Sequence, residues 1–419
     1  MKNRWIFIFL ILFLIVLSSC NTENLEPTEI FDSTESAESI EPTDSTETTE
    51  SAETSEVTEP KEPAESGESI ESTDTVEPTE ATETSKEILK ELEYEAEVIA
   101  TGLKIPWEIV PMPDGRILIT ERGGSVLLLE KGEIYSIAEV KHEGEGGLLG
   151  MTLSPNFKED NLIYLYYTYM EDKKTYNKVS QFIFKEDTIE DEKVILDKIP
   201  GSKFHNGGRI KFGPDDKLYI TTGDAQEKSL SQDIESLAGK ILRINPDGTI
   251  PSDNPFPSSP VFALGIRNSQ GLAWHPATGD LFASDHGPSS RDEVNLIESG
   301  GNYGWPNITC DQVDPKYINP ITCYTDFTLA PSGIDFYPKE SQDGFSLYVA
   351  GLRGNRIMRV LLDKEGNFIK EESLFEDFGR VRTVVYYEDA IYIATNNTDG
   401  RGNPKKDDDK IIKISIKEK

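Results

Sequence analysis

Short apolar runs separated by turn-forming residues recur along most of the chain. The basic unit is a short apolar run, a turn rich in Pro, Asp, Asn and Gly, and a second apolar run. Such runs are typical of β-strands, and the turn residues between them predict tight antiparallel pairs. No helical periodicity is sustained over the same region. The unit occurs six times, at residues 107–120, 147–166, 208–221, 270–283, 333–350 and 383–394.

A third strand-like run usually follows each unit, as at residues 125–130, 240–245 and 356–362. A single sheet of this kind cannot bury both of its faces, so such units stack around an axis. The six copies therefore predict an all-β fold, a six-bladed β-propeller over residues 86–419. We expect a strand near residues 93–100 to complete the last blade and close the ring. A β-sandwich is the alternative, but its strands would not recur in this fixed order.

The first twenty residues predict export. Lys2 and Arg4 precede an apolar run at residues 5–17, which is too short to span a bilayer comfortably and is typical of a signal peptide. The run ends in Leu-Ser-Ser-Cys, which resembles a bacterial lipobox with cleavage before Cys20 and lipidation of its thiol. Residues 1–20 are therefore interpreted as a lipoprotein signal peptide, so that the folded part is extracytoplasmic and held on the membrane by the lipid alone. An uncleaved anchor and an ordinary signal peptide are the alternatives.

Residues 21–85 form an acidic, Pro-containing segment. They consist mainly of Glu, Ser, Thr and Pro, with 21 acidic residues against one lysine. So little apolar surface cannot offset the chain entropy, and the like charges extend the segment further, which predicts a disordered stalk. The formal net charge of the whole chain is −34, and the part after the stalk is acidic as well. This charge argues against binding nucleic acid or an anionic membrane surface.

Cysteine usage fits an exported protein. With Cys20 assigned to the lipid, Cys310 and Cys323 remain as a pair across a short loop that contains Pro and Asp. In an oxidising compartment such a pair predicts a disulfide. A metal site is the less favoured alternative, because two cysteines without nearby histidines make a poor zinc ligand set.

Four segments place Gly, His, Arg and Asn where strands would prefer apolar residues. All four precede or join predicted strands, so a propeller would gather them on one face although they are far apart in the sequence. A nicotinamide-binding fingerprint and a serine-hydrolase nucleophile motif are both missing. The segments are residues 143–150, 204–210, 265–271 and 285–295, the last running on through 300–306.

In this order, the four segments resemble those of the PQQ-dependent soluble glucose and aldose sugar dehydrogenases, over roughly residues 103–414. The resemblance implies a six-bladed propeller that oxidises an aldose at C1 with pyrroloquinoline quinone (PQQ) and calcium. It aligns His205 with the catalytic base of the family. A neutral imidazole suits this role, because the hydroxyl proton must be removed as hydride leaves the carbon. Phe204 replaces a polar residue of some glucose-oxidising relatives, so strict glucose specificity is not expected.

The resemblance also implies a set of cofactor-binding residues. PQQ carries three carboxylates, and guanidinium groups can bind carboxylates through two hydrogen bonds. Arg267 with Asn268 matches one cofactor-binding position, and Arg380 with Arg382 matches another. Residues two apart on a strand face the same side, which suits two arginines that hold one ligand. Arg353 falls where some relatives have lysine, which keeps the charge and changes the geometry.

Glu145 is a departure from the family pattern. It stands in the first Gly-rich segment, where the family usually has a glutamine that contacts cofactor and sugar. A carboxylate there would repel a PQQ carboxylate unless it is protonated or paired.

Calcium prefers oxygen ligands, including main-chain carbonyls. The resemblance implies that the carbonyls of Gly287 and Pro288 face a calcium ion that also binds PQQ. Glu293 and the carbonyl of Tyr303 are further metal ligands in the family. Different members use these two sets, so one ion or two is left open.

Two other functions compete with the dehydrogenase. A calcium-dependent propeller lactonase would use the metal but would not need three arginines for a tricarboxylate. A propeller without cofactor could instead serve as a carbohydrate-binding surface scaffold. The sequence leaves open which sugar is oxidised and which electron acceptor reoxidises the cofactor.

Overall fold

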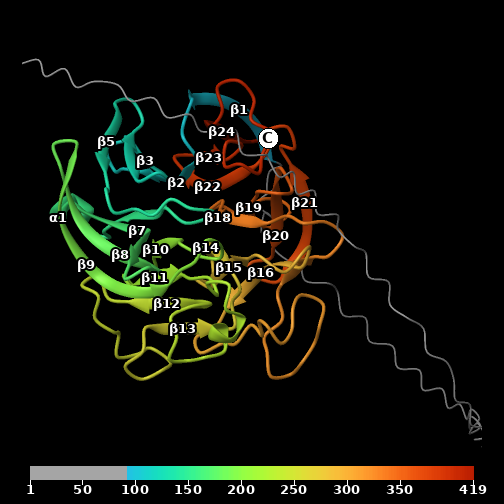
Figure 1. The fold of residues 1–419 in the computed structure, drawn as a ribbon. Helices are drawn as coiled ribbons and strands as arrows, with labels where there is room; N and C mark the ends of the chain where they lie inside the picture. Colours follow the sequence, from blue (N-terminus) through green and yellow to red (C-terminus); the bar gives the residue numbers. More distant parts are fainter. Residues whose placement is uncertain (1–91) are drawn as a thin grey trace, which may run out of the picture. The chain divides into compact units, whose positions relative to one another are not determined.

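The computed structural model describes residues 92–419, which form a six-bladed β-propeller (Figure 1). Six four-stranded antiparallel sheets follow one another around the ring, which confirms the fold predicted from the repeats. The predicted signal peptide, the stalk and Cys20 lie outside the described residues and stay predictions. Within residues 92–419, no helix is long and apolar enough to cross a membrane.

The blades follow the chain in order. The first contains β2 (Pro106–Pro111), β3 (Ile117–Glu121), β4 (Ser125–Leu128) and β5 (Gly132–Ser136). The second contains β6 (Leu148–Leu153), β7 (Leu162–Glu171), β8 (Lys174–Lys185) and β9 (Thr188–Pro200). The third contains β10 (Ile210–Phe212), β11 (Leu218–Thr221), β12 (Lys240–Ile244) and β13 (Val261–Leu264).

The second half of the ring repeats this arrangement. The fourth blade contains β14 (Ser269–Trp274), β15 (Leu281–Asp285), β16 (Asp292–Ile297) and β17 (Thr322–Tyr324). The fifth contains β18 (Pro331–Phe336), β19 (Phe345–Gly351), β20 (Arg356–Leu362) and β21 (Phe368–Leu374). The sixth contains β22 (Val381–Tyr387), β23 (Ala390–Thr395), β24 (Lys410–Glu418) and β1 (Leu92–Thr101). The helical turns α1 (Phe157–Asp160) and η1 (Lys228–Ser231) lie in the connections.

The ring closes through its first strand. β1 pairs antiparallel with β24, from Leu92 opposite Glu418 to Thr101 opposite Lys410. In Figure 1 the blue β1 therefore lies beside the red β24. This confirms the predicted closing strand and ties the start of the folded domain to its end.

The turn chemistry of the repeats explains the strand pairs. Between β2 and β3, the Gly115 N–H donates to the Met112 carbonyl (3.0 Å), and Gly115 has a φ of +87° that favours glycine. The Asp114 side chain accepts the Arg116 N–H (3.1 Å) and closes the turn. Asp215 has the same role between β10 and β11. Each turn directs the chain straight back into its sheet.

The hydrophobic core lies between the blades. The first strands of neighbouring blades lie next to one another around the axis, and apolar side chains fill the space between the sheets. One such layer joins Trp107 of the first blade, Leu149 of the second and Ile210 of the third. Each side chain of this size contributes about 1.5–3 kcal/mol when fully buried. Because the ring holds its connecting loops in place, functional residues are expected in those loops.

Candidate active site

Four loops that are far apart in the sequence contact one another. The Glu145 N–H donates to the Lys203 carbonyl (2.8 Å), and the Gly207 N–H donates to the side-chain oxygen of Asn268 (3.0 Å). The His286 N–H donates to the Asn268 carbonyl (3.4 Å). The structure thus brings together the four segments that the sequence analysis singled out.

His205 is held by a buried carboxylate. Its Nδ1 lies 2.7 Å from Oδ1 of Asp224, whose side chain is 1 % exposed. The Asp224 carboxylate also accepts the indole N–H of Trp305 (2.9 Å) and the Gln226 N–H (2.8 Å). Burial disfavours the charged carboxylate, but interactions with His205, led by its hydrogen bond, and the hydrogen bonds from Gln226 and Trp305 outweigh it and hold the pKa of Asp224 below its ordinary value.

The backbone around His205 is tightly constrained. His205 itself has a φ of +60°, and its carbonyl accepts the Ala225 N–H (3.1 Å). A Cβ at Gly223 would lie 2.1 Å from that carbonyl oxygen, so the close approach requires glycine. These contacts fix the imidazole relative to Asp224.

Glu145 is paired. Its Oε1 forms an ion pair with Nη1 of Arg401 (2.7 Å), and Oε2 accepts the His205 N–H (3.1 Å) and the Asn268 side-chain N–H (3.2 Å). Burial disfavours its charge, but His286, Arg401 and the His205 N–H outweigh burial and lower the pKa of Glu145 to about 2. Of these groups, His286 is charged only in acid, so Arg401 is the counter-charge at neutral pH. The sequence left open whether the Glu145 carboxylate is protonated or paired, and in the structure it is paired.

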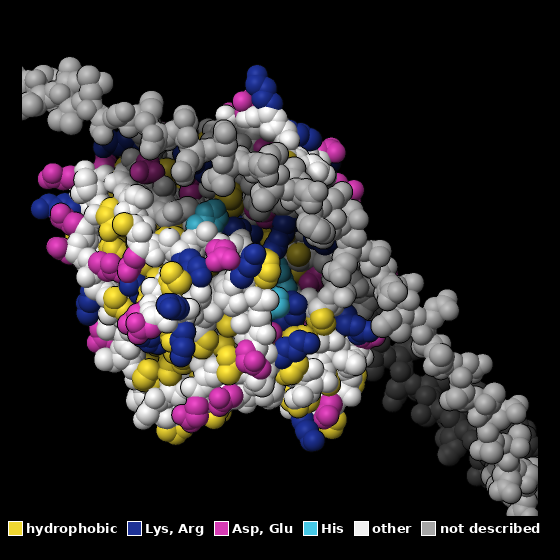
Figure 2. Space-filling model, viewed as in Figure 1, with side chains coloured by type: hydrophobic (Ala, Val, Ile, Leu, Met, Phe, Trp, Pro, Cys, Tyr) yellow, Lys and Arg dark blue, Asp and Glu magenta, His cyan; other side chains and the backbone are white. Residues whose placement is uncertain are grey.

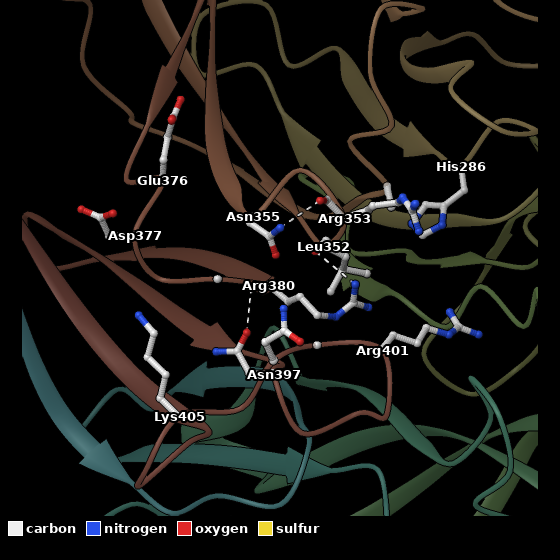
Figure 3. A pocket seen from close by; sticks show the side chains of 14 residues that line it. His286, Leu352, Arg353, Asn355, Glu376, Asp377, Arg380, Asn397, Arg401 and Lys405 are labelled. Carbon is white, nitrogen blue, oxygen red and sulfur yellow. Dashed lines mark hydrogen bonds between the residues drawn. The ribbon is translucent and has the colours of Figure 1, made fainter.

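A large cavity of about 820 Å³ opens beside Arg401. Its size suits a small organic ligand. In Figure 3 the side chains of Arg353, Arg380 and Arg401 extend toward the part of the cavity where His286 lies. Figure 2 shows histidine side chains among Lys and Arg near the middle of this face. The lining residues are His286, Ala330, Leu352, Arg353, Asn355, Glu376, Asp377, Gly379, Arg380, Asn397, Arg401, Gly402, Asn403 and Lys405.

Arg380 and Arg382 have different surroundings. Arg380 lines the cavity and forms an ion pair with Asp399 (2.7 Å). Arg382 is 3 % exposed and donates to Gln270 (2.5 Å) and Asn396 (2.8 Å) beneath the site. Its burial and neighbouring arginines lower the pKa of Arg382 to about 9. A bulge interrupts the β22–β23 ladder between Val381 and Thr383, and of the two arginines only Arg380 is among the cavity-lining residues.

Arg267 and His286 lie at a second, small cavity of about 10 Å³. Arg267 donates to the His286 carbonyl (2.9 Å) and stacks over Trp305, 5.3 Å from the ring centroid. Burial and nearby arginines lower the pKa of His286 to about 3, so its ring is neutral at pH 7. Nε of Arg267 and Nε2 of His286 are buried without a hydrogen-bond partner in the structure. Such groups suit a polar ligand, and His286 lines both cavities.

The predicted metal residues converge on the small cavity. Gly287, Glu293 and Tyr303 line it, whereas Pro288 is not among its lining residues. Asp285 also lines it and lies opposite Glu293 in the β15–β16 ladder. Two buried carboxylates with nearby carbonyls are a donor set that suits calcium. In residues 92–419, no group of three or more His, Cys, Asp or Glu side chains is placed to hold a metal, so carbonyls would have to complete the set.

A disulfide holds Glu293 in place. Cys310 and Cys323 are joined, with 5.4 Å between their Cα atoms. The Cys310 N–H donates to Oε1 of Glu293 (2.6 Å), and Cys323 lies opposite Glu293 in the β16–β17 ladder. Asn295 donates to Oε2 (3.2 Å). Burial raises the pKa of Glu293.

Two residues of the site were missed by the sequence analysis. Asp224 lies three residues after the end of strand β11 in a Thr-Thr-Gly-Asp sequence, and a lone carboxylate soon after a buried strand is the signal that could have found it. Arg401 lies in the polar connection between β23 and β24, 256 residues from Glu145, and no local pattern marks it.

Residues 103–406 match the family model described as Glucose / Sorbosone dehydrogenase. The chain belongs to this family. The resemblance drawn from the four segments is therefore confirmed.

Members of the glucose/sorbosone dehydrogenase family with known names are similar over most of the propeller. The PQQ-bound aldose sugar dehydrogenase of Streptomyces coelicolor is 35 % identical, with a TM-score of 0.72, covering 78 % of this chain and 99 % of that structure. The aldose sugar dehydrogenase of Escherichia coli is 28 % identical over 73 % of this chain and 90 % of its own length. The quinoprotein glucose dehydrogenase B of Acinetobacter calcoaceticus is 35 % identical over 54 % of this chain and 55 % of its own length.

Proposed function

We propose that this protein is a PQQ-dependent aldose sugar dehydrogenase that oxidises the sugar at C1 to the lactone. The observation that carries the proposal is the His205–Asp224 pair in a member of this family, linked through Glu145 to Arg401, which lines a cavity with two further arginines. Its relatives are named sugar dehydrogenases, and one of them is PQQ-bound. The lactonase and the scaffold without cofactor are not favoured, since no relative cited above has either function.

His205 is the general base in this proposal. Asp224 accepts the Nδ1–H, which leaves Nε2 as the nitrogen able to accept the C1 hydroxyl proton of the sugar. Trp305 and Gln226 hold the Asp224 carboxylate, so the orientation of the imidazole is set before the sugar binds. At 20 % exposure, the His205 side chain is still accessible to a ligand.

The residues of the cavities fit PQQ. Arg353 and Arg380 on the large cavity, with Arg267 and Asn268 beside the small one, offer cationic and amide donors for three carboxylates. The unpartnered Nε of Arg267 is a donor that such an acceptor would satisfy. When bound, PQQ supplies a quinone that accepts the hydride from C1. Arg382 adds positive charge beneath the site.

Calcium is proposed as the second cofactor. Glu293 and the carbonyls of Gly287 and Tyr303 lie at one small cavity, next to Arg267. The carbonyl of Pro288, adjacent in the chain, is the remaining predicted ligand. The cation would neutralise buried carboxylates and polarise a bound quinone oxygen.

The proposed cellular setting rests on the N-terminal sequence. A lipid on Cys20 and an extended acidic stalk at residues 21–85 would hold the enzyme on the outer side of the membrane. Its partners there would be the aldose substrate and an electron acceptor still to be identified. The acidic composition argues against a nucleic-acid partner.

Dye reduction by the purified protein tests the proposal. A panel of aldoses is assayed with and without added PQQ and calcium, next to a His205→Ala variant. Activity that requires both additions and is lost in the variant supports the proposed reaction. Absence of sugar-dependent dye reduction with both cofactors present would overturn it.

A further inference from the structure

A line of charged side chains, joined by two ion pairs and by backbone N–H groups, runs from the large cavity to the loop of the base. Arg380 forms an ion pair with Asp399 (2.7 Å), and the other oxygen of Asp399 accepts the Arg401 N–H (2.9 Å). The Arg401 guanidinium forms an ion pair with Glu145 (2.7 Å), which accepts the His205 N–H (3.1 Å). Each charge in this line therefore has an opposite charge as its neighbour.

Arg401 is the exposed member of this line. Its side chain is 45 % exposed, whereas that of Glu145 is 14 % exposed. The guanidinium lines the large cavity, as Figure 3 shows, and lies 5.0 Å from the ring centroid of Phe204. It therefore stands between the Glu145 carboxylate and the space that a ligand would occupy.

Glu145 poses an electrostatic problem for the proposed cofactor. Its carboxylate is ionised at neutral pH and is anchored to the His205 loop and to Asn268, so it cannot turn away from the site. An unpaired carboxylate at this border would repel an anion in the cavity. Within residues 92–419, Arg401 is the residue that forms an ion pair with it.

We propose that Arg401 is a positioning residue that neutralises Glu145 and thereby lets the tricarboxylate PQQ bind beside it. The proposal deepens the proposed function and rests on it. In this arrangement Arg401 acts through Glu145, and the two side chains together present a neutral, hydrogen-bonding surface to the cavity.

A double-mutant cycle on PQQ affinity tests this coupling. The dissociation constant of PQQ is measured by quenching of tryptophan fluorescence for the wild type, Arg401→Gln, Glu145→Gln and the double variant. We expect Arg401→Gln to weaken binding at least 10-fold, because it exposes the Glu145 charge. We expect Glu145→Gln to stay within 3-fold of the wild type, and the double variant to stay within 3-fold of Glu145→Gln.

Two controls separate charge from structure. Arg401→Lys keeps the positive charge and should stay within 3-fold of the wild-type affinity. Arg116→Gln removes a comparably exposed guanidinium, 35 % exposed and paired with Asp114 and Asp187, from the turn before β3, and should leave PQQ affinity unchanged. Melting temperatures of all variants are measured in parallel.

The outcomes are distinguishable. The inference is overturned if Arg401→Gln binds PQQ as tightly as the wild type. It is also overturned if Arg401→Gln weakens PQQ binding by the same factor in the wild-type and Glu145→Gln backgrounds, because Arg401 then does not act through Glu145. If the wild type itself does not bind PQQ, the proposed function fails, and the inference fails with it.

Discussion

Two carboxylate–guanidinium pairs in this propeller differ in their access to the cavity. Glu108 and Arg209 pair inside the ring, where their side chains are 3 % and 2 % exposed. Arg209 also donates to the Gln270 carbonyl (2.9 Å) and stacks on Trp107, 4.1 Å from the ring centroid. This pair is enclosed by protein on all sides.

The second pair, Glu145 and Arg401, lies at the cavity. Its members come from loops rather than from the inner strands, and Arg401 is nearly half exposed. The protein thus uses a carboxylate–guanidinium ion pair in two different ways. The inner pair links two blades and keeps either charge from being buried alone, whereas the outer pair lies where a ligand would meet its charge.

The largest effect is expected at the base itself. His205→Asn should lower kcat about 10²- to 10⁴-fold, because proton removal from the sugar hydroxyl is lost. Steady-state kinetics with PQQ and calcium present measure it. The matched control is His275→Asn: His275 is 1 % exposed in a blade turn, and its loss should lower stability without lowering kcat. Equal kcat losses in both variants would contradict the assignment.

The next effect tests the inner pair. Glu108→Ala leaves the Arg209 charge buried and unpaired, which should cost about 3–5 kcal/mol of unfolding free energy. Glu145→Ala leaves the Arg401 guanidinium, which is 45 % exposed and can be solvated by water, so this variant should cost less than Glu108→Ala. Urea unfolding of both variants measures the difference. Similar costs would remove the distinction drawn between the two pairs.

A smaller kinetic effect is expected from the partner of the base. Asp224→Asn should lower kcat about 10²-fold, because the imidazole loses the acceptor that fixes its Nδ1–H, while PQQ affinity stays within 3-fold. Asp224→Glu restores the charge and should recover part of the rate. A variant that loses PQQ binding in proportion to kcat would instead indicate a damaged site.

The smallest effect concerns acid stability. The pKa of Glu145 is about 2 in the folded protein and near 4.5 when unfolded, so the unfolded state binds more protons between these values. The stabilisation from Glu145 is therefore present above pH 4.5 and is lost as the pH falls toward 2. Melting temperatures at pH 5, 4 and 3 should fall more steeply in the wild type than in Glu145→Gln. Parallel pH dependences would contradict the low pKa.

The fold was predictable because its signal is repetitive. Strands such as β3 and β19 are buried along their whole length and mostly apolar, and Gly and Asp mark turns between such strands. Apart from the closing strand β1, the fourth strands of the blades were not predicted. β5 and β21 lie at the rim with most residues exposed or half-buried, so they lack the apolar pattern that identifies a strand.

The site was predictable only where motifs mark it. The segments around His205 and Arg267 carry Gly, His and Arg in a recognisable order, and these segments do meet. The partners of the site residues are fixed by tertiary contact: Asp224 reaches His205 from the next loop, and Arg401 reaches Glu145 across the closed ring. Arg380 lines the large cavity, whereas Arg382 is buried against Gln270 and Asn396, and no sequence pattern separates these two arginines.

A single-turnover experiment tests the central claim most directly. PQQ is bound to the wild type and to His205→Asn with calcium present, excess aldose is added without a dye, and the PQQ absorbance is followed. The account predicts that both proteins bind PQQ and that sugar reduces it rapidly in the wild type alone. Wild-type protein that binds PQQ but does not reduce it with any aldose, or equal reduction rates in both proteins, would contradict the account.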